Sequence, residues 1–191
     1  MSLFDDFQVA VTPRASYARL VAARHDGRWL DALERPFLYA LLVGTCVAIA
    51  ATGQASFGLI ASTTAAWSWV VVVQLVIALA MTRGSATGRT VSEPRAFELW
   101  FAGHVPWTLW MLVLAPSVRA YPALPVEEIL FSMLAPIAWT SAIAAAYGRT
   151  VLGRSTVTSW LLAMIHPLAI VGVVLSYVAW SAGGWFRLVG P

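Results

Sequence analysis

The feature that most constrains this chain is the length of its stretches without a charged residue. Residues 36–82 form a run of 47 residues that contains no Asp, Glu, Lys or Arg. A membrane-spanning helix needs about 20 apolar residues, so this run has room for two such helices and a turn. Turn-forming residues, Thr52 to Gly58, lie near its middle. The pattern predicts spanning helices over residues 36–53 and 62–82.

Three further uncharged runs predict three more spanning helices. Residues 99–118 and 129–148 are runs of 20 residues each, and residues 155–186 form a longer one. Each is long enough to cross a bilayer once. We therefore expect helices over residues 97–118, 129–148 and 156–180. The predicted fold class is all-α: a polytopic membrane helix bundle with five transmembrane helices, formed by residues 36–191.

The composition agrees with a membrane protein and excludes some other classes. Of the 191 residues, 60% are hydrophobic and 11% are charged, whereas soluble domains are about one quarter charged. The net charge of +3 is small and scattered, so no nucleic-acid partner is expected. Cys46 is the single cysteine, which excludes an intrachain disulfide and a cysteine metal cluster.

Residues 1–35 are predicted to be a cytoplasmic N-terminal segment. Thr12 and Pro13 resemble a helix N-cap followed by proline at the first helical position, and Gly27 suits a C-terminal stop. The short helix between them is expected to lie on the cytoplasmic leaflet, although its arginines are not confined to one face. The alternative is a soluble lead-in whose arginines only enforce topology.

The distribution of arginine predicts the orientation. Cytoplasmic loops near the ends of spans retain basic residues. Ten of the 12 arginines lie in residues 1–35 and in the links between predicted helices 2 and 3 and helices 4 and 5, and only Arg119 and Arg187 lie on the opposite side. We therefore expect a multi-pass protein of the inner (plasma) membrane, with a cytoplasmic N-terminus and the C-terminus outside.

Small residues recur at every fourth position in two of the predicted helices. Gly44 and Ala48 belong to such a stripe in the helix over residues 36–53, and Ala138 and Ala142 belong to one in the helix over residues 129–148. Stripes of this kind let helix backbones approach closely in a membrane. They predict helix-packing sites, although generic use of alanine explains the second stripe equally well.

Three polar side chains are expected inside the membrane at similar depth. At a rise of ~1.5 Å per residue, His104, His166 and Gln74 lie roughly 10–15 Å from the predicted cytoplasmic ends of their helices. Polar residues in a span are functional candidates, so these three form a predicted polar layer. Glu98 lies at the edge of its helix, where it can pair with Arg95 or Arg35.

The two histidines allow two interpretations. A pair of neutral imidazoles at one depth is what axial ligation of haem b requires, so His104 and His166 are alternative haem ligands. However, prolines follow closely at Pro106 and Pro167, and a histidine can satisfy the backbone carbonyls that a proline frees. This structural role is the favoured interpretation, and no cofactor or metal is expected.

Some segments resemble the Ypt-interacting-protein (Yip) family of five-span membrane proteins, in particular its small bacterial members. They are the N-terminal TPRASY from Thr12 to Tyr17, Pro36 at the start of the first span, the basic link before the third, and FELWFAGHVP from Phe97 to Pro106. The resemblance implies five spans, a cytoplasmic N-terminus and an outward C-terminus. The Asp-Leu-Tyr-Gly-Pro signature of the GTPase-binding relatives is not found here, so that activity is not implied.

No catalytic motif is recognised in the sequence, and an enzyme is not the favoured class. The favoured function is a scaffold or accessory subunit that acts through helix packing, whose partners are the lipid bilayer and other membrane subunits or further copies of this chain. The alternatives are a transporter or channel component that uses the polar layer, and a redox subunit that binds haem b.

Overall fold

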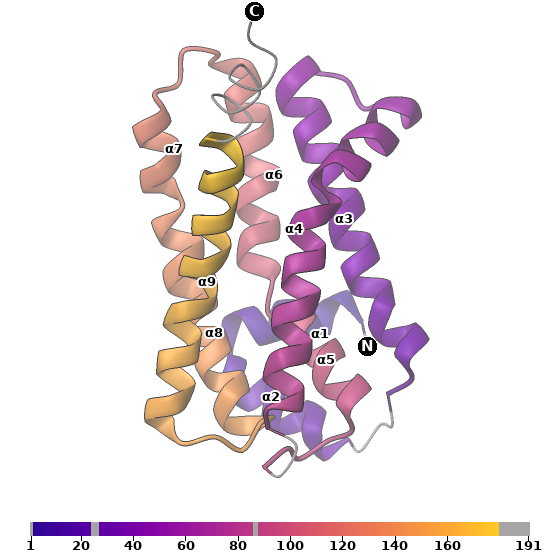
Figure 1. The fold of residues 1–191 in the computed structure, drawn as a ribbon, viewed down its shortest axis with the longest axis vertical. Helices are drawn as coiled ribbons and strands as arrows, with labels where there is room; N and C mark the ends of the chain where they lie inside the picture. The colour runs from indigo at the N-terminus through magenta and orange to yellow at the C-terminus, as the bar shows by residue number, and fades with distance from the viewer. Residues whose placement is uncertain (1, 24–26, 86–87, 180–191) are drawn as a thin grey trace, which may run out of the picture.

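The computed structural model describes residues 2–23, 27–85 and 88–179, and every regular element in these ranges is a helix. Four helices are long and apolar enough to cross a membrane, namely Trp29–Thr52, Phe57–Arg83, Glu93–Ala120 and Glu127–Thr150, and Thr156–Gly172 is a shorter apolar helix. Their outer faces carry exposed large apolar side chains such as Val76, Leu112 and Leu168. The structure confirms the predicted fold class of a helical membrane bundle (Figure 1).

The first long helices form an antiparallel pair. Helix α3 (Trp29–Thr52) ends at Gly53, whose φ of 73° is the left-handed conformation that glycine adopts most easily. Helix α4 (Phe57–Arg83) then returns along α3. Both helices begin earlier than the predicted spans at residues 36 and 62. Helix α3 begins before the uncharged run, since a charge gap marks only the apolar part of a helix. Helix α4 begins at Phe57 because the turn after α3 is shorter than predicted.

Two of the predicted spans are interrupted helices. The third consists of α5 (Glu93–Ala102) and α6 (Val105–Ala120), and the fourth of α7 (Val126–Ser132) and α8 (Leu134–Thr150). Each break lies two or three residues before a proline: Gly103 and His104 precede Pro106, and Met133 precedes Pro136. Proline has no N–H, so the carbonyl four residues earlier loses its helical partner. The last helix, α9 (Thr156–Ala179), continues through Pro167.

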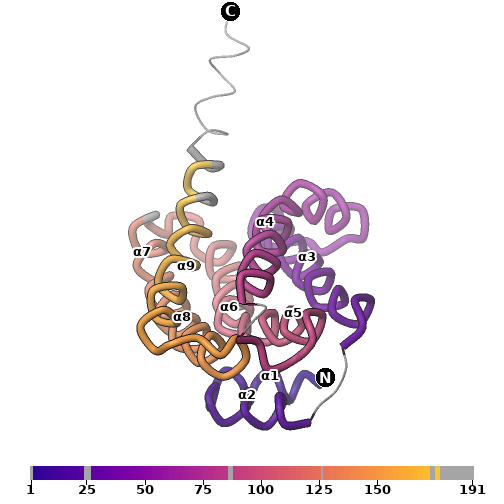
Figure 2. Tube along the Cα trace, turned by 60° about the horizontal axis from the view of Figure 1, so that its bottom comes forward, coloured from indigo at the N-terminus to yellow at the C-terminus, as the bar shows by residue number. Residues whose placement is uncertain are grey.

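We call the end of the bundle where α4 and α8 end and α9 begins the arginine-rich end (Figure 1). Two short helices, α1 (Leu3–Val11) and α2 (Pro13–Ala22), pack near this end against α5 and α8 (Figure 2). The Trp139 indole N–H donates to the carbonyl of Ala10 at 2.8 Å, and the Tyr17 ring is fully buried. The predicted short helix after Thr12 is α2, whose inner face is part of the bundle core, whereas α1 was not predicted from the sequence.

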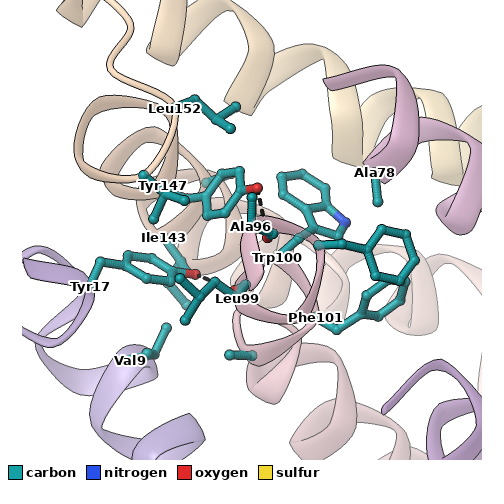
Figure 3. Packing of buried hydrophobic residues seen from close by; sticks show 14 of the residues in the cluster. Val9, Tyr17, Ala78, Ala96, Leu99, Trp100, Phe101, Ile143, Tyr147 and Leu152 are labelled. Atoms are coloured by element: carbon teal, nitrogen blue, oxygen red, sulfur yellow. Dashed lines mark hydrogen bonds between the residues drawn. The ribbon is translucent and has the colours of Figure 1, made fainter. Parts of the chain in front are cut away.

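The centre of the core is α5, in which every residue from Arg95 to Ala102 is buried. Two tyrosines hold it from one side: Tyr17 of α2 donates its hydroxyl to the carbonyl of Leu99 at 3.3 Å, and Tyr147 of α8 donates to the carbonyl of Ala96 at 2.9 Å (Figure 3). The two tyrosine rings meet edge to face at 5.6 Å. Because α5 is enclosed by its neighbours, its position in the bundle is fixed. The positions of the polar residues near its two ends are fixed with it.

The two predicted packing stripes lie in different surroundings, one at a helix contact and one on an exposed face. Gly44 lies where α3 and α4 come closest, since a Cβ there would meet the backbone of Thr64 at 2.7 Å, and Ala48 is fully buried. Ala138 and Ala142 are exposed instead. The buried face of α8 carries Thr140, Ile143, Ala144 and Tyr147, so the second stripe lies beside the packing face and not on it.

Candidate functional site

A large cavity, of about 350 Å³, lies among the helices of the bundle. Its walls come from α3, α4, α6, α7 and α9, in the half of the bundle away from the arginine-rich end. The lining is mostly aliphatic and aromatic, with Trp67, Trp107 and Trp110 among the larger side chains. Binding sites for small molecules are commonly apolar cavities of about this size with a few polar groups.

The polar groups of this cavity are contributed by Tyr39, Gln74 and His104. Tyr39 is engaged already, since its hydroxyl lies 2.7 Å from the hydroxyl of Thr108. Gln74 is half-buried and forms no hydrogen bond with a described residue. His104 is 2% exposed. Two of the three residues of the predicted polar layer, Gln74 and His104, therefore line the same cavity.

The break between α5 and α6 places His104 at the cavity. Gly103 and His104 lie outside both helices and donate their backbone N–H groups to Trp100 and Phe101, at 3.1 and 3.2 Å. His104 is the N-cap residue of α6, with φ −90° and ψ 4°. Its ring stacks on Phe101 with 5.2 Å between the ring centroids. If the helix were unbroken, the side chains of α6 would point in other directions relative to α5. The break therefore determines which side chains face the cavity.

The hydrogen bond of the His104 ring determines its tautomer. Nδ1 lies 3.3 Å from the carbonyl oxygen of Trp100. A carbonyl only accepts hydrogen bonds, so Nδ1 carries the proton of the neutral ring. Nε2 is then an acceptor, and it has no hydrogen-bond partner among the described residues. An unpaired acceptor on a buried ring is costly, which makes it a candidate for ligand contact.

His166 lies beside His104 but outside the large cavity. The two ring centroids are 6.0 Å apart at an interplanar angle of 77°, and Trp100 packs on His166 at 4.7 Å. His166 lines a separate cavity of about 10 Å³, the volume of roughly one water molecule. The predicted layer is therefore brought together in space, but His166 is a packed residue next to the cavity.

The geometry of the histidines does not suit a haem. A porphyrin with two axial histidines lies between their nitrogens, and therefore needs a slot that is open to both. The slot is missing here, because His104 lines the large cavity and His166 the small one. In the described part of the chain, no group of three or more His, Cys, Asp and Glu side chains could hold a metal ion.

A second polar cluster lies at the other end of α5. Glu98 accepts from Arg95 at 2.6 Å and from Arg35 at 3.0 Å, and Arg35 also binds Asp6 of α1 at 2.8 Å. All four side chains are at most 14% exposed. Burial raises the pKa of Asp6 from its ordinary value, and the Arg35 charge opposes this shift. The cluster joins α1, α3 and α5 and has an adequate structural role.

Asp6 and the aromatic lining of the cavity were not predicted from the sequence. Asp6 stands close to other acids in the N-terminal segment, and nothing local to it signals an ion pair with residue 35. Trp107 and Trp110 belong to a helix whose tryptophans fit packing or lipid contact equally well. The usable signal was Pro106 after His104, which marks the helix break.

Comparison with known proteins finds no matching family model, no similar curated protein and no similar solved structure.

Proposed function

We propose that this integral membrane protein binds a lipid-soluble molecule that carries a hydroxyl group, in the cavity lined by His104 and Gln74. The observation that carries the proposal is that His104, whose buried Nε2 acceptor has no partner among the described residues, lines an apolar cavity of about 350 Å³. A buried acceptor is satisfied by a donor, and a hydroxyl is the smallest neutral donor that an apolar molecule can carry.

The walls of the cavity support an apolar body for this molecule. Trp67 of α4 and Trp107 and Trp110 of α6 offer flat aromatic surfaces, and aliphatic residues of α3 and α9 complete the lining. Gln74 adds an amide that can both donate and accept. A ligand of this kind reaches the protein through the bilayer, since the outer faces of the bundle are apolar.

In this proposal the arginine-rich end faces the cytoplasm and the cavity lies in the outer half of the inner membrane. The positive-inside rule supports this orientation, and the resemblance to the Yip family is consistent with it. The resemblance specifies no ligand. Of the functions predicted from the sequence, the cavity favours the one that uses the intramembrane polar residues. The scaffold or accessory role stays a prediction, because the exposed apolar faces of a membrane bundle contact lipid as well as protein.

The test is photo-crosslinking of the purified full-length protein with a long-chain alcohol that carries a diazirine in its tail. We expect labelled peptides from the cavity wall, around Trp67 to Gln74 and Trp107 to Leu114. Excess unlabelled alcohol should compete, and the methyl ether of the same chain should not, because it has no donor for His104.

Two substitutions of His104 provide the matched pair. His104→Asn keeps a donor near the Trp100 carbonyl and removes the acceptor at the Nε2 position, so labelling should fall roughly five-fold, the value of one hydrogen bond. His104→Gln restores an acceptor at that position and should retain labelling. Equal competition by the ether, or labels spread evenly over the lipid-facing helices, would contradict the proposal.

A further inference from the structure

A second cavity, of about 200 Å³, lies near the arginine-rich end between α2, α8 and α9. It shares no lining residue with the large cavity. Its apolar wall is formed by Ala142, Ala145 and Ala146 of α8 and by the indole of Trp160 of α9. Ala142 of the second predicted stripe therefore borders a space beside α8.

Two arginines on different helices line this cavity, Arg14 of α2 and Arg149 of α8. Neither forms an ion pair or a hydrogen bond with a described residue. Other arginines of this end do: Arg19, Arg35, Arg83 and Arg95 pair with acids, and Arg89 and Arg154 bind backbone or hydroxyl oxygens. The cavity thus combines an apolar wall with two cations that have no partner in the described part of the chain.

The N-terminus of α2 adds a third attraction for an anion. Pro13, the first residue of α2, also lines the cavity. The N-cap residue Thr12 makes no capping hydrogen bond, because its hydroxyl binds the carbonyl of Gln8 and the hydroxyl of Ser16. Backbone N–H groups in the first turn of α2 are therefore uncapped, and helix N-termini of this kind favour anions.

We propose that this cavity binds an anionic glycerophospholipid, with the phosphate between Arg14 and Arg149 and an acyl chain along the alanines and Trp160. The two positive charges select the negative headgroup, as basic pockets between membrane helices do. The apolar wall supplies the contact that distinguishes a lipid from free phosphate. The bound lipid joins α2 to α8 and α9 and so holds the N-terminal helices on the bundle.

The experiment follows thermal unfolding of the full-length protein in mild detergent during titration with one of three additives. We expect phosphatidylglycerol to raise the unfolding temperature at lower concentration than phosphatidylcholine with the same chains, and inorganic phosphate to have no comparable effect. Arg14→Gln and Arg149→Gln should each weaken the apparent affinity for phosphatidylglycerol about five-fold, the effect of one basic residue on an anionic lipid.

Two further variants separate a built site from general charge attraction. Arg28→Gln removes another exposed arginine that has no ion pair with a described residue and lies outside the cavity lining, so the affinity should not change. Ala142→Trp fills the cavity but keeps both charges, and should abolish the preference for phosphatidylglycerol. The proposal is wrong if phosphatidylcholine or inorganic phosphate stabilises the protein equally, or if the Arg14→Gln/Arg149→Gln double variant responds like the wild type.

Discussion

At the scale of single residues, the charged groups of the core belong to one connected cluster. Asp6, Arg35, Glu98 and Arg95 come from three helices, and Glu98 accepts hydrogen bonds from both arginines. Buried charges of this kind contribute little net stability as a set, because their desolvation is costly. Removing one partner is different, since it leaves the others buried without a counter-charge. Glu98 is the most sensitive position of the cluster, because it neutralises two arginines.

We expect Glu98→Gln to lower the free energy of unfolding by about 3 kcal/mol, the usual effect of breaking a buried ion pair. Glu93→Gln is the matched control, because Glu93 pairs with Arg83, whose side chain is 69% exposed. That substitution should cost less than about 1 kcal/mol. Both values can be measured by unfolding titrations in detergent. Equal losses for the two variants would show that the buried cluster has no special role.

Asp5 makes the stability of the N-terminal helix α1 depend on pH. The backbone N–H of Ser2, followed by the Arg19 side chain, lowers the pKa of Asp5 from 3.8 to about 2. A lowered pKa means that the stabilisation is complete above pH 3.8 and is lost as the pH falls toward about 2. Asp5→Ala should remove this part of the acid dependence, and at neutral pH should cost about 1 kcal/mol through loss of the capping box.

The measurement compares the thermal unfolding of wild type and Asp5→Ala between about pH 6 and about pH 2. The difference in unfolding temperature between the two proteins reports on Asp5, because both proteins contain Asp6, whose pKa is raised by burial. A stability difference that stays constant across this range would mean that Asp5 is not held by Ser2 and Arg19.

Part of the residue-scale structure could be predicted from the sequence. Glu98 was placed near Arg35 and Arg95 because all three lie at the predicted membrane edge. Asp6 could not be placed, since its partner is 29 residues away and depends on how α1 folds back on the bundle. Ion pairs between distant segments require the tertiary arrangement, which charge patterns alone do not contain.

At the scale of elements, the break between α5 and α6 positions the site, whereas the sequence predicted continuous helices over residues 97–118 and 129–148. The break before Pro106 places His104 at the cavity. Pro36, Pro116 and Pro167, however, lie inside helices that continue through them. A proline removes one hydrogen bond, and whether the helix then breaks depends on the packing around it. The order of the apolar helices follows from hydropathy, but helix interruptions do not.

The contact between α3 and α4 gives an element-scale prediction. At Gly44 an added Cβ would meet the amide nitrogen of Thr64 at 2.7 Å and its Cα at 2.8 Å. These are backbone atoms, so the two helices must move apart. Gly44→Ala should therefore destabilise the protein by about 1–3 kcal/mol, as overpacking usually does.

Gly58→Ala is the control for this prediction, because a Cβ at Gly58 would have no neighbour within 4 Å. Alanine is also the better helix former, so this change should be neutral or slightly stabilising. Unfolding titrations of both variants provide the measurement. If Gly44→Ala is as stable as the wild type, the close contact of α3 and α4 is not needed for the fold.

At the scale of the whole molecule, the candidate site exists only because several helices surround it. Counting residues from the helix ends predicted that Gln74, His104 and His166 share one layer, and the first two do line one cavity. Depth along a helix can be estimated from its rise per residue. The rotation of each helix about its axis cannot be estimated in this way. This rotation is the reason why His104 lines the large cavity while His166 is packed beside it.

The orientation of the bundle is the whole-molecule prediction. Among described arginines, Arg119 lies near the end of α6, away from the arginine-rich end. Cytoplasmic loops retain basic residues, so the arginine-rich end should face the cytoplasm. The test starts from a Cys46→Ala background, which removes the single native cysteine. Single cysteines are then placed at exposed positions of opposite ends, Ala23 after α2 and Ala55 between α3 and α4.

A membrane-impermeant maleimide applied to intact cells should label the cysteine at position 55, while the one at position 23 should react only after the membrane is permeabilised. The opposite labelling pattern would show that the bundle has the inverse orientation in the membrane. The large cavity would then lie in the cytoplasmic half of the bilayer, and the two arginines of the smaller cavity would face the outer leaflet. The two proposed sites depend on orientation in different ways: His104 contacts a neutral molecule from either leaflet, whereas Arg14 and Arg149 need a leaflet that contains anionic lipid.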